Sequence, residues 1–327
     1  MSKTKSPVAY YGGKANLASE ILPLIPRHVQ YVEPFFGSGA IFWGRSHRSK
    51  NEVINDLNGS VTNFYWQLKT NFVELQKMVQ ATLHSEILYI KAKEMLKDDA
   101  CPPLEKAWAF WVGCNMAFGH VLFGGFAFCE TGSGGGTKNK RDGFNDKFTK
   151  RLEYCEIFNR DAVELIELKD SENTFFYVDP PYVSSEQGHY AGYTTEDFIK
   201  LLNVLKSIKG KFLMSSYLEE ILMKYREECG WLSKDIKQVV LVSGKREETK
   251  YKIECLTMNY TPPNNQAGLF DEARAEEKEE FKEMVESELA PEPQEDGEPI
   301  MERAERLLEE KDEPIFTEEE LNEGKEL

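Results

Sequence analysis

The chain has 327 residues, of which 41% are hydrophobic and 29% charged, and its formal net charge is −16. That length can bury a large core and hold two lobes. The chain shows no run of 18 apolar residues and no apolar signal segment, which argues against a membrane-spanning or exported protein. The six cysteines form no Cys-x-x-Cys pair, so we expect them to be reduced in a cytoplasmic protein.

The acidity is confined to the C-terminal segment. Residues 264–327 hold 24 Asp and Glu against 7 Lys and Arg, so residues 1–263 keep 32 acidic and 33 basic side chains, a net charge of +1. Repeated glutamates, several prolines and few aromatic residues are typical of disordered chain. We therefore expect residues 264–327 to form an acidic, disordered tail, and the nearly neutral remainder does not exclude nucleic acid as a partner.

The first motif along the chain is Tyr10-Tyr11-Gly12-Gly13-Lys14. An apolar segment that we expect to be helical, Leu17–Ile25, follows it. A double glycine that ends in lysine is by itself typical of a turn with a solvated lysine. Taken alone, the motif predicts a turn and no site.

A glycine turn comes next. Val29–Phe36 reads as a strand, Gly37-Ser38-Gly39 as a loop and Ala40–Arg45 as the start of a helix, which is the entry of a nucleotide-binding α/β unit. A second strand is predicted at Glu52–Asn58, where Asp56 stands 17 residues after Gly39. That spacing is close to the ~20 residues at which an acidic side chain meets ribose hydroxyls in dinucleotide folds. Asp56 alone could equally cap a helix, but with the glycine turn it favours an adenosine-containing cofactor.

The middle of the chain differs from both flanks. We expect buried helices at Glu105–Cys114 and in parts of Phe72–Met95. The glycine-rich segment Gly124–Gly143 then reads as a flexible basic loop, which suits contact with phosphates, although a solvated surface excursion would have the same composition. The residues that we expect to contact nucleic acid are Lys138, Lys140, Arg141 and Lys147.

The most informative feature is the apolar strand Thr174–Val178, which runs into Asp179-Pro180-Pro181-Tyr182. Each proline fixes its own φ and holds the preceding residue extended, so the strand end is stiff. The Asp179 carboxylate, the Pro180 carbonyl and the Tyr182 ring then face one small volume. Two acceptors beside a flat ring suit a planar group that bears an NH2, such as a base turned out of its duplex. A strand that runs into a proline turn is the alternative interpretation.

The remaining elements complete the predicted fold. We expect an amphipathic helix at Thr195–Ile208, strands at Lys211–Ser215 and Lys252–Met258, and a hairpin of the latter with Val239–Val242. The predicted fold class is α/β, a mostly parallel sheet with helices on both faces and a mainly helical inserted lobe. The five histidines are isolated, so no metal site is expected.

Four segments together resemble a known family. Tyr10–Lys14, Glu33–Ala40, Ile54–Asn58 and Asp179–Tyr182 are similar to the motifs of the S-adenosylmethionine-dependent adenine-N6 DNA methyltransferases. The order, with the cofactor motif before Asp-Pro-Pro-Tyr, is that of the Dam-type group. Tyr154–Ile166 also resembles a family segment and places Asp161 where the cofactor adenine is met, although Asn-Arg-Asp-Ala is also a common helix start. The resemblance spans roughly residues 10–260.

The resemblance implies a Rossmann-like methyltransferase sheet and transfer of a methyl group from S-adenosylmethionine to N6 of a flipped adenine in a short duplex DNA sequence. Residues 1–65 and 155–263 would form the catalytic core, and 66–154 a lobe that recognises the target. The implied catalytic residues are Asp179, Pro180, Pro181 and Tyr182. The implied cofactor residues are Tyr10, Gly13, Lys14, Glu33, Pro34, Phe35, Gly37, Gly39, Asp56, Asp161 and Asp179.

Two alternatives stay open at this point. One is another amino methyltransferase, acting on cytosine N4, RNA or a protein amide, and the other is a nucleotide-binding oxidoreductase. The root of the tail adds a candidate partner, because Gln266, Leu269 and Phe270 resemble the short peptides by which bacterial replication proteins dock on the sliding clamp. Chance, or a last apolar contact with the core, would produce the same residues.

Overall fold

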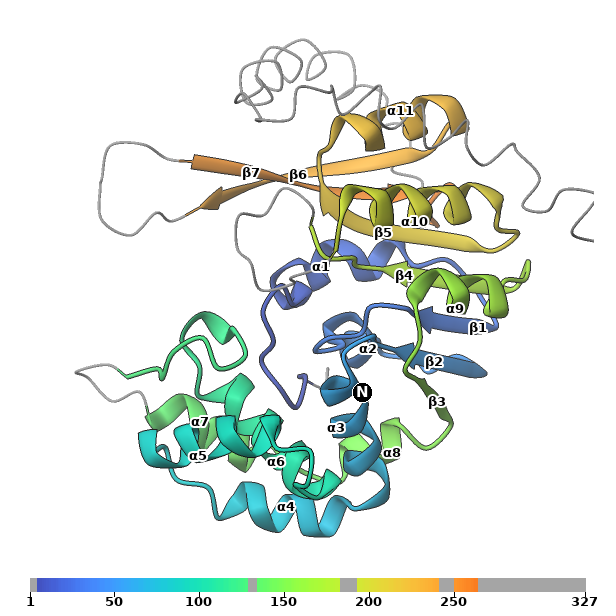
Figure 1. Cartoon of the computed structure of the whole chain (residues 1–327). Helices are drawn as coiled ribbons and strands as arrows, with labels where there is room; N and C mark the ends of the chain where they lie inside the picture. The colour runs from blue at the N-terminus through green and yellow to red at the C-terminus, as the bar shows by residue number, and fades with distance from the viewer. Residues whose placement is uncertain (1–4, 129–133, 183–192, 241–249, 264–327) are drawn as a thin grey trace, which may run out of the picture.

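A mixed sheet of seven strands forms the centre of the molecule (Figure 1), whose computed structural model describes residues 5–128, 134–182, 193–240 and 250–263. Five neighbouring strands pair in parallel, and two more strands extend the sheet beyond the last of them through antiparallel pairing. The predicted α/β fold with a mostly parallel sheet is therefore confirmed. The spatial order is β3 (Cys155–Phe158), β2 (Asn51–Asn55), β1 (Gln30–Glu33), β4 (Thr174–Val178), β5 (Lys211–Tyr217), β7 (Lys250–Met258) and β6 (Leu232–Val240).

Helices cover both faces of the sheet, which is why β4 is buried along its whole length. Phe175 and Tyr177 belong to one hydrophobic cluster, and Phe176 and Val178 to the other, because alternate side chains of a strand point to opposite faces. On the second face lie α9 (Ala162–Lys169), α10 (Thr195–Ser207) and α11 (Glu220–Cys229). The first face is covered by η1 (Lys14–Leu17), α1 (Ala18–Ile21), η2 (Leu22–Leu24) and α2 (Ala40–Gly44).

A helical lobe is inserted between β2 and β3 and lies beside the sheet (Figure 1). Its central helix is α6, in which every residue from Ala107 to Cys114 is buried and which packs against four neighbouring helices. None of the described helices is long and apolar enough to cross a membrane. The helices are α3 (Gly59–Thr70), α4 (Phe72–Gln80), α5 (Glu86–Lys97), α6 (Pro103–Asn115), η3 (Phe118–His120), α7 (Gly134–Asp142) and α8 (Lys147–Arg151).

The predicted flexible loop at Gly124–Gly143 is wrong in its second half, because α7 is a helix. Glycines at its start disfavour a helix in isolation. Tertiary contacts compensate: Thr137 is buried and its hydroxyl lies 2.9 Å from the His84 ring, and α7 packs against α4 and α6. Packing of the whole lobe thus overrides local propensity.

Other predicted elements differ mainly in length. The strand expected at Val29–Phe36 is reduced to β1, because Pro34 cannot donate to the sheet. The helix expected at Leu17–Ile25 consists of short helical pieces. β6 begins seven residues before the expected Val239, since its polar side chains concealed an antiparallel strand. The predicted hairpin with β7 is confirmed, and the Thr194 side chain caps α10.

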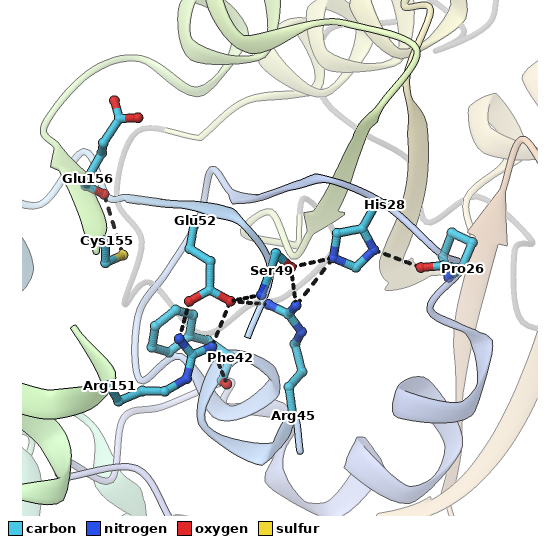
Figure 2. Close-up of polar contacts among 9 residues, drawn as sticks. All are labelled: Pro26, His28, Phe42, Arg45, Ser49, Glu52, Arg151, Cys155 and Glu156. Atoms are coloured by element: carbon cyan, nitrogen blue, oxygen red, sulfur yellow. Dashed lines mark hydrogen bonds and ion pairs between the residues drawn. The ribbon is translucent and has the colours of Figure 1, made fainter. Parts of the chain in front are cut away.

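A buried cluster of charges ties the lobe to the sheet (Figure 2). Glu52, 1% exposed at the start of β2, accepts from Arg45 at 2.9 Å and from Arg151 of α8 at 2.9 Å. The Ser49 N–H donates to the same carboxylate, and the Ser49 hydroxyl lies 2.7 Å from the His28 ring. The pKa of His28 is lowered, mainly because the ring is buried. Because Glu52 is buried between two guanidinium groups, its loss would leave two unpaired cations.

Glu52→Ala should therefore lower the free energy of unfolding by about 3–5 kcal/mol, the usual loss when one partner of a buried ion pair is removed. Glu153→Ala is the matched control, because it breaks the more exposed pair with Lys69 and should cost no more than about 1 kcal/mol. Urea unfolding followed by circular dichroism gives both values. Equal losses for the two variants would contradict the proposed anchoring role.

Candidate functional site

A cavity of about 1200 Å³ opens where the chain leaves the parallel strands. Its size exceeds the ~300–1,000 Å³ of common small-molecule sites, so it has room for a ligand and a second planar group. β1 and β4 are neighbours, but their chains continue to opposite sides of the sheet, and ligands of open α/β sheets bind at such a switch point. The predicted site residues that line it are Tyr10, Gly13, Lys14, Glu33, Pro34, Phe35, Gly37, Asp56, Asp161, Asp179, Pro180, Pro181 and Tyr182.

The glycine turn after β1 depends on two residues with positive φ, Gly37 at 46° and Gly39 at 63°. Gly39 is the N-terminal cap residue of α2 and does not line the cavity. A Cβ atom built on Gly39 would lie 2.3 Å from Cζ of Phe36. Gly39 therefore allows the Phe36 ring to pack against the turn, while Gly37 is part of the cavity wall.

Asp56 connects this turn to the end of β2. Its Oδ2 accepts from the Gly37 N–H at 2.8 Å, and its Oδ1 from the Asn58 N–H at 2.9 Å. Burial raises the pKa of Asp56 to about 6, although these two hydrogen bonds lower it. The helix-cap interpretation of Asp56 is wrong, because the Asn58 side chain caps α3. A carboxylate has about four acceptor positions, so Asp56 can still accept from a ligand.

Asp161 has a structural task as well as a place in the cavity wall. Its side chain caps α9 by accepting from the Val163 N–H at 2.8 Å and the Glu164 N–H at 3.3 Å. The common helix start suggested by the sequence is thus confirmed for Asp161. Its contact with a cofactor stays a prediction.

Lys14 is buried and paired with a carboxylate, so the solvated lysine expected from its motif alone is wrong. Its Nζ lies 2.7 Å from Oδ1 of Asp179 and donates to the Gly12 carbonyl at 2.9 Å. Burial alone would lower the pKa of Lys14, but Asp179 and Glu254 raise it above the ordinary value. The ammonium is therefore charged, and it fixes one oxygen of Asp179.

Ser215 holds the same oxygen of Asp179. Its hydroxyl donates to Oδ1 at 2.8 Å and lies 3.1 Å from the Tyr177 hydroxyl. Among the residues that the structure describes, Asp179 has two side-chain partners, Lys14 and Ser215. Both of them contact Oδ1. The carboxylate is thus held by one oxygen, and its Oδ2 remains available to accept from a ligand.

Tyr182 is fixed by residues from three segments. Its hydroxyl donates to Oε1 of Glu254 on β7, and its ring lies 4.2 Å from the Tyr217 ring between centroids. The Lys14 ammonium lies 4.8 Å from the Tyr182 ring centroid. Sequence reasoning missed Glu254, Ser215 and Tyr217. The one available signal was Glu254, a lone acid in the apolar strand at Lys252–Met258.

The basic residues predicted to contact nucleic acid divide into two groups. Lys140 donates to the Ser6 carbonyl at 3.3 Å, and burial lowers its pKa. Arg141 donates to the Thr82 carbonyl at 2.9 Å. Lys138 and Lys147 are exposed, although Lys138 pairs with Asp142 of the same helix. Exposure favours Lys138 and Lys147 for phosphate contact.

This chain is similar in sequence to known proteins. The profile of the D12 class N6 adenine-specific DNA methyltransferases matches residues 10–253. The type II methyltransferase M.CviBI of Paramecium bursaria Chlorella virus NC1A is 22% identical over 64% of this chain and 82% of its own. The type II methyltransferase M1.LlaDCHI of Lactococcus lactis subsp. cremoris is 26% identical over 63% and 78%. A DNA adenine methylase of Vibrio cholerae serotype O1 is 33% identical over 21% and 24%.

Substitution can separate the two constraints on Gly39, its positive φ and its contact with Phe36. Gly39→Ala adds both the strain of a positive φ and a clash with Phe36, whereas Gly230→Ala adds the same strain at 66° with no atom within 4 Å. We expect Gly230→Ala to lower the free energy of unfolding by about 1–2 kcal/mol, and Gly39→Ala by clearly more. Urea unfolding measures both values. Equal losses would show that Phe36 yields without cost and that the turn does not depend on this contact.

Proposed function

Because this chain belongs to the D12 class N6 adenine-specific DNA methyltransferase family, we propose that its cavity binds S-adenosylmethionine together with an adenine turned out of duplex DNA. As a member of that family the protein methylates N6 of adenine in DNA. The observation that carries the proposal is that Asp179-Pro180-Pro181-Tyr182 and the Gly37 turn line one cavity. The family match decides against cytosine N4, RNA, a protein amide and an oxidoreductase reaction.

The donor groups of the cavity fit the cofactor. Glu33 is 2% exposed, and its Oε2 has no hydrogen-bond partner among the described residues. Burial raises the pKa of Glu33 well above its usual range, so a cationic ligand group beside it would offset the cost of a buried charge. The α-ammonium of S-adenosylmethionine is such a group. We assign it to Glu33.

The adenosine part of the cofactor fits the other side of the same cavity. Asp56 stands at the end of β2, where an acidic residue accepts from ribose hydroxyls in dinucleotide folds. The Phe35 and Tyr193 rings meet edge to face with centroids 6.3 Å apart, and both line the cavity beside Asp161. We propose that the cofactor adenine lies against Phe35 and near Asp161.

The residues of this chain then act on the base. When bound, S-adenosylmethionine supplies an electrophilic methyl group on its sulfonium. The adenine NH2 is a weak nucleophile, because its lone pair is delocalised into the ring. Acceptance of its two N–H bonds by Oδ2 of Asp179 and by the Pro180 carbonyl turns the lone pair toward the methyl group. The carboxylate also stabilises the positive charge that develops on N6.

We further propose a division of labour along the chain. Residues 1–65 and 155–263 form the catalytic core, and residues 66–154 form the lobe that recognises the target sequence. The protein acts in the cytoplasm. α3 runs across the boundary at residue 65 and packs against α6, so the two parts share a helix. The sliding-clamp peptide with Gln266, Leu269 and Phe270 lies outside the described residues, and its docking stays a prediction.

Asp179→Ala should lower methyl transfer by at least about 100-fold, because it removes an acceptor aimed at the charge that develops on N6. Binding of S-adenosylmethionine should stay within about threefold of wild type if Glu33 and Asp56 hold it. Tritium transfer to unmethylated phage DNA and isothermal titration measure the two effects. Asp235→Ala is the control, since Asp235 pairs with Arg226 outside the cavity. An Asp179→Ala enzyme of normal rate would disprove the assigned role.

The proposed phosphate contacts have a different signature. Lys138→Gln and Lys147→Gln should each reduce the slope of log K against log salt by about one for every phosphate contact that is lost. Lys209→Gln removes an exposed charge just before β5, at the opposite edge of the sheet from the cavity, and should leave the slope unchanged. Fluorescence anisotropy of a labelled duplex at several salt concentrations gives the slopes. Unchanged slopes for Lys138→Gln and Lys147→Gln would exclude those contacts.

A further inference from the structure

Glu254 is a buried carboxylate whose position the predicted mechanism does not use. It lies on the antiparallel strand β7, is 4% exposed and stands opposite Tyr217 of β5 in the sheet register. A carboxylate in such a place costs free energy unless it is paired and hydrogen-bonded. The groups that pair with the Glu254 carboxylate therefore indicate what its burial achieves.

Both partners of Glu254 are cavity residues. The Tyr182 hydroxyl donates to its Oε1, and the Lys14 ammonium lies 3.8 Å from the same oxygen. Burial raises the pKa of Glu254, while Lys14 and the Tyr182 hydroxyl lower it. Lys14 is thus the cationic neighbour of Glu254 as well as of Asp179, and Oε1 of Glu254 accepts from the Tyr182 hydroxyl.

The geometry leaves Tyr182 few orientations. The Glu254 carboxylate holds its hydroxyl, while the Tyr217 ring, tilted by 58°, and the Lys14 ammonium contact its ring. The hydroxyl oxygen lies on the axis about which χ2 turns, so its hydrogen bond to Glu254 limits rotation about χ1 and thereby fixes where the ring lies. The contacts with the Tyr217 ring and the Lys14 ammonium bear on the ring face and limit rotation about χ2.

We propose that Glu254 is a positioning residue for methyl transfer, which holds the Tyr182 ring at the place where the flipped adenine stacks on it. The proposal rests on the proposed function, in which Tyr182 is the stacking surface and Asp179 the acceptor. A base that stacks on a displaced ring presents its N6 nitrogen away from Oδ2 of Asp179. A displacement of about 1 Å between reacting groups can cost about 100-fold in rate.

The effect of Glu254 should therefore appear in kcat and should pass through Tyr182. We expect Glu254→Ala to lower kcat by about 10- to 100-fold, with KM for S-adenosylmethionine within about threefold of wild type. Glu254→Gln keeps an oxygen that accepts from the Tyr182 hydroxyl, so it should restore kcat to within about fivefold. Tyr182→Phe removes the donor, and in that background Glu254→Ala should add little further loss.

The test is a double-mutant cycle of Glu254→Ala and Tyr182→Phe on phage DNA, with Glu254→Gln as the conservative variant and thermal unfolding to confirm folding. Glu20→Gln is the control, because Glu20 pairs with Lys234 away from the cavity. A normal kcat for Glu254→Ala, additive losses in the cycle, or a Glu254→Gln enzyme as slow as Glu254→Ala would each overturn the proposal.

Two further outcomes keep the test decisive. If Glu254→Ala does not fold, Glu254→Gln and Tyr182→Phe still carry it, since a kcat for Tyr182→Phe equal to wild type would exclude any role through that hydroxyl. Failure of the proposed function is seen separately. A wild-type enzyme that methylates no DNA would contradict that function, whereas active wild type with an equally active Glu254→Ala contradicts only the role of Glu254.

Discussion

The parallel pairing of β1 with β4 is the constraint on which the site depends. Their register places Val32 opposite Phe176, so the two strands end at the same level of the sheet. Glu33 and Asp179 therefore line the same cavity. From β1 the chain moves outward to β2 and β3, and from β4 it moves the other way to β5. Within the described residues the two connections thus diverge from the space between the strand ends, which is where open α/β sheets bind their ligands.

The buried charge cluster around Glu52 and the one around Lys14 differ in how many hydrogen bonds their carboxylates accept from described residues. Glu52 accepts from Arg45, Arg151 and a backbone N–H, which leaves it with a purely structural task (Figure 2). In the cavity one ammonium, Lys14, serves the two carboxylates Asp179 and Glu254. That arrangement leaves acceptor capacity on Asp179, and a site that must bind a hydrogen-bond donor needs such capacity.

The helical lobe is joined to the cavity by direct contacts. The Tyr65 hydroxyl of α3 donates to the Gly37 carbonyl at 3.1 Å, and the Tyr10 ring meets the Phe110 ring of α6 at 5.8 Å between centroids. The Asn115 side chain at the end of α6 accepts from the Ala9 N–H at 3.1 Å. These contacts couple the position of α3 and α6 to the glycine turn and to the residues around Lys14. Packing of the lobe therefore contributes to the shape of the cavity.

The sequence by itself determined the elements whose cause is local. An apolar run that ends in two prolines predicted β4 and its stiff end, and the two glycines of Gly37-Ser38-Gly39 predicted the turn after β1, because backbone sterics act within a few residues. Only the tertiary structure decided which groups meet. Lys14 looked like a solvated lysine until β4 brought Asp179 to it, and Glu254 reaches Tyr182 only because β7 pairs with β5. α7 is helical despite its glycines because it packs against α4 and α6 and buries Thr137. Strand pairing and burial depend on residues that are far apart in the chain, so a local sequence pattern cannot predict these contacts.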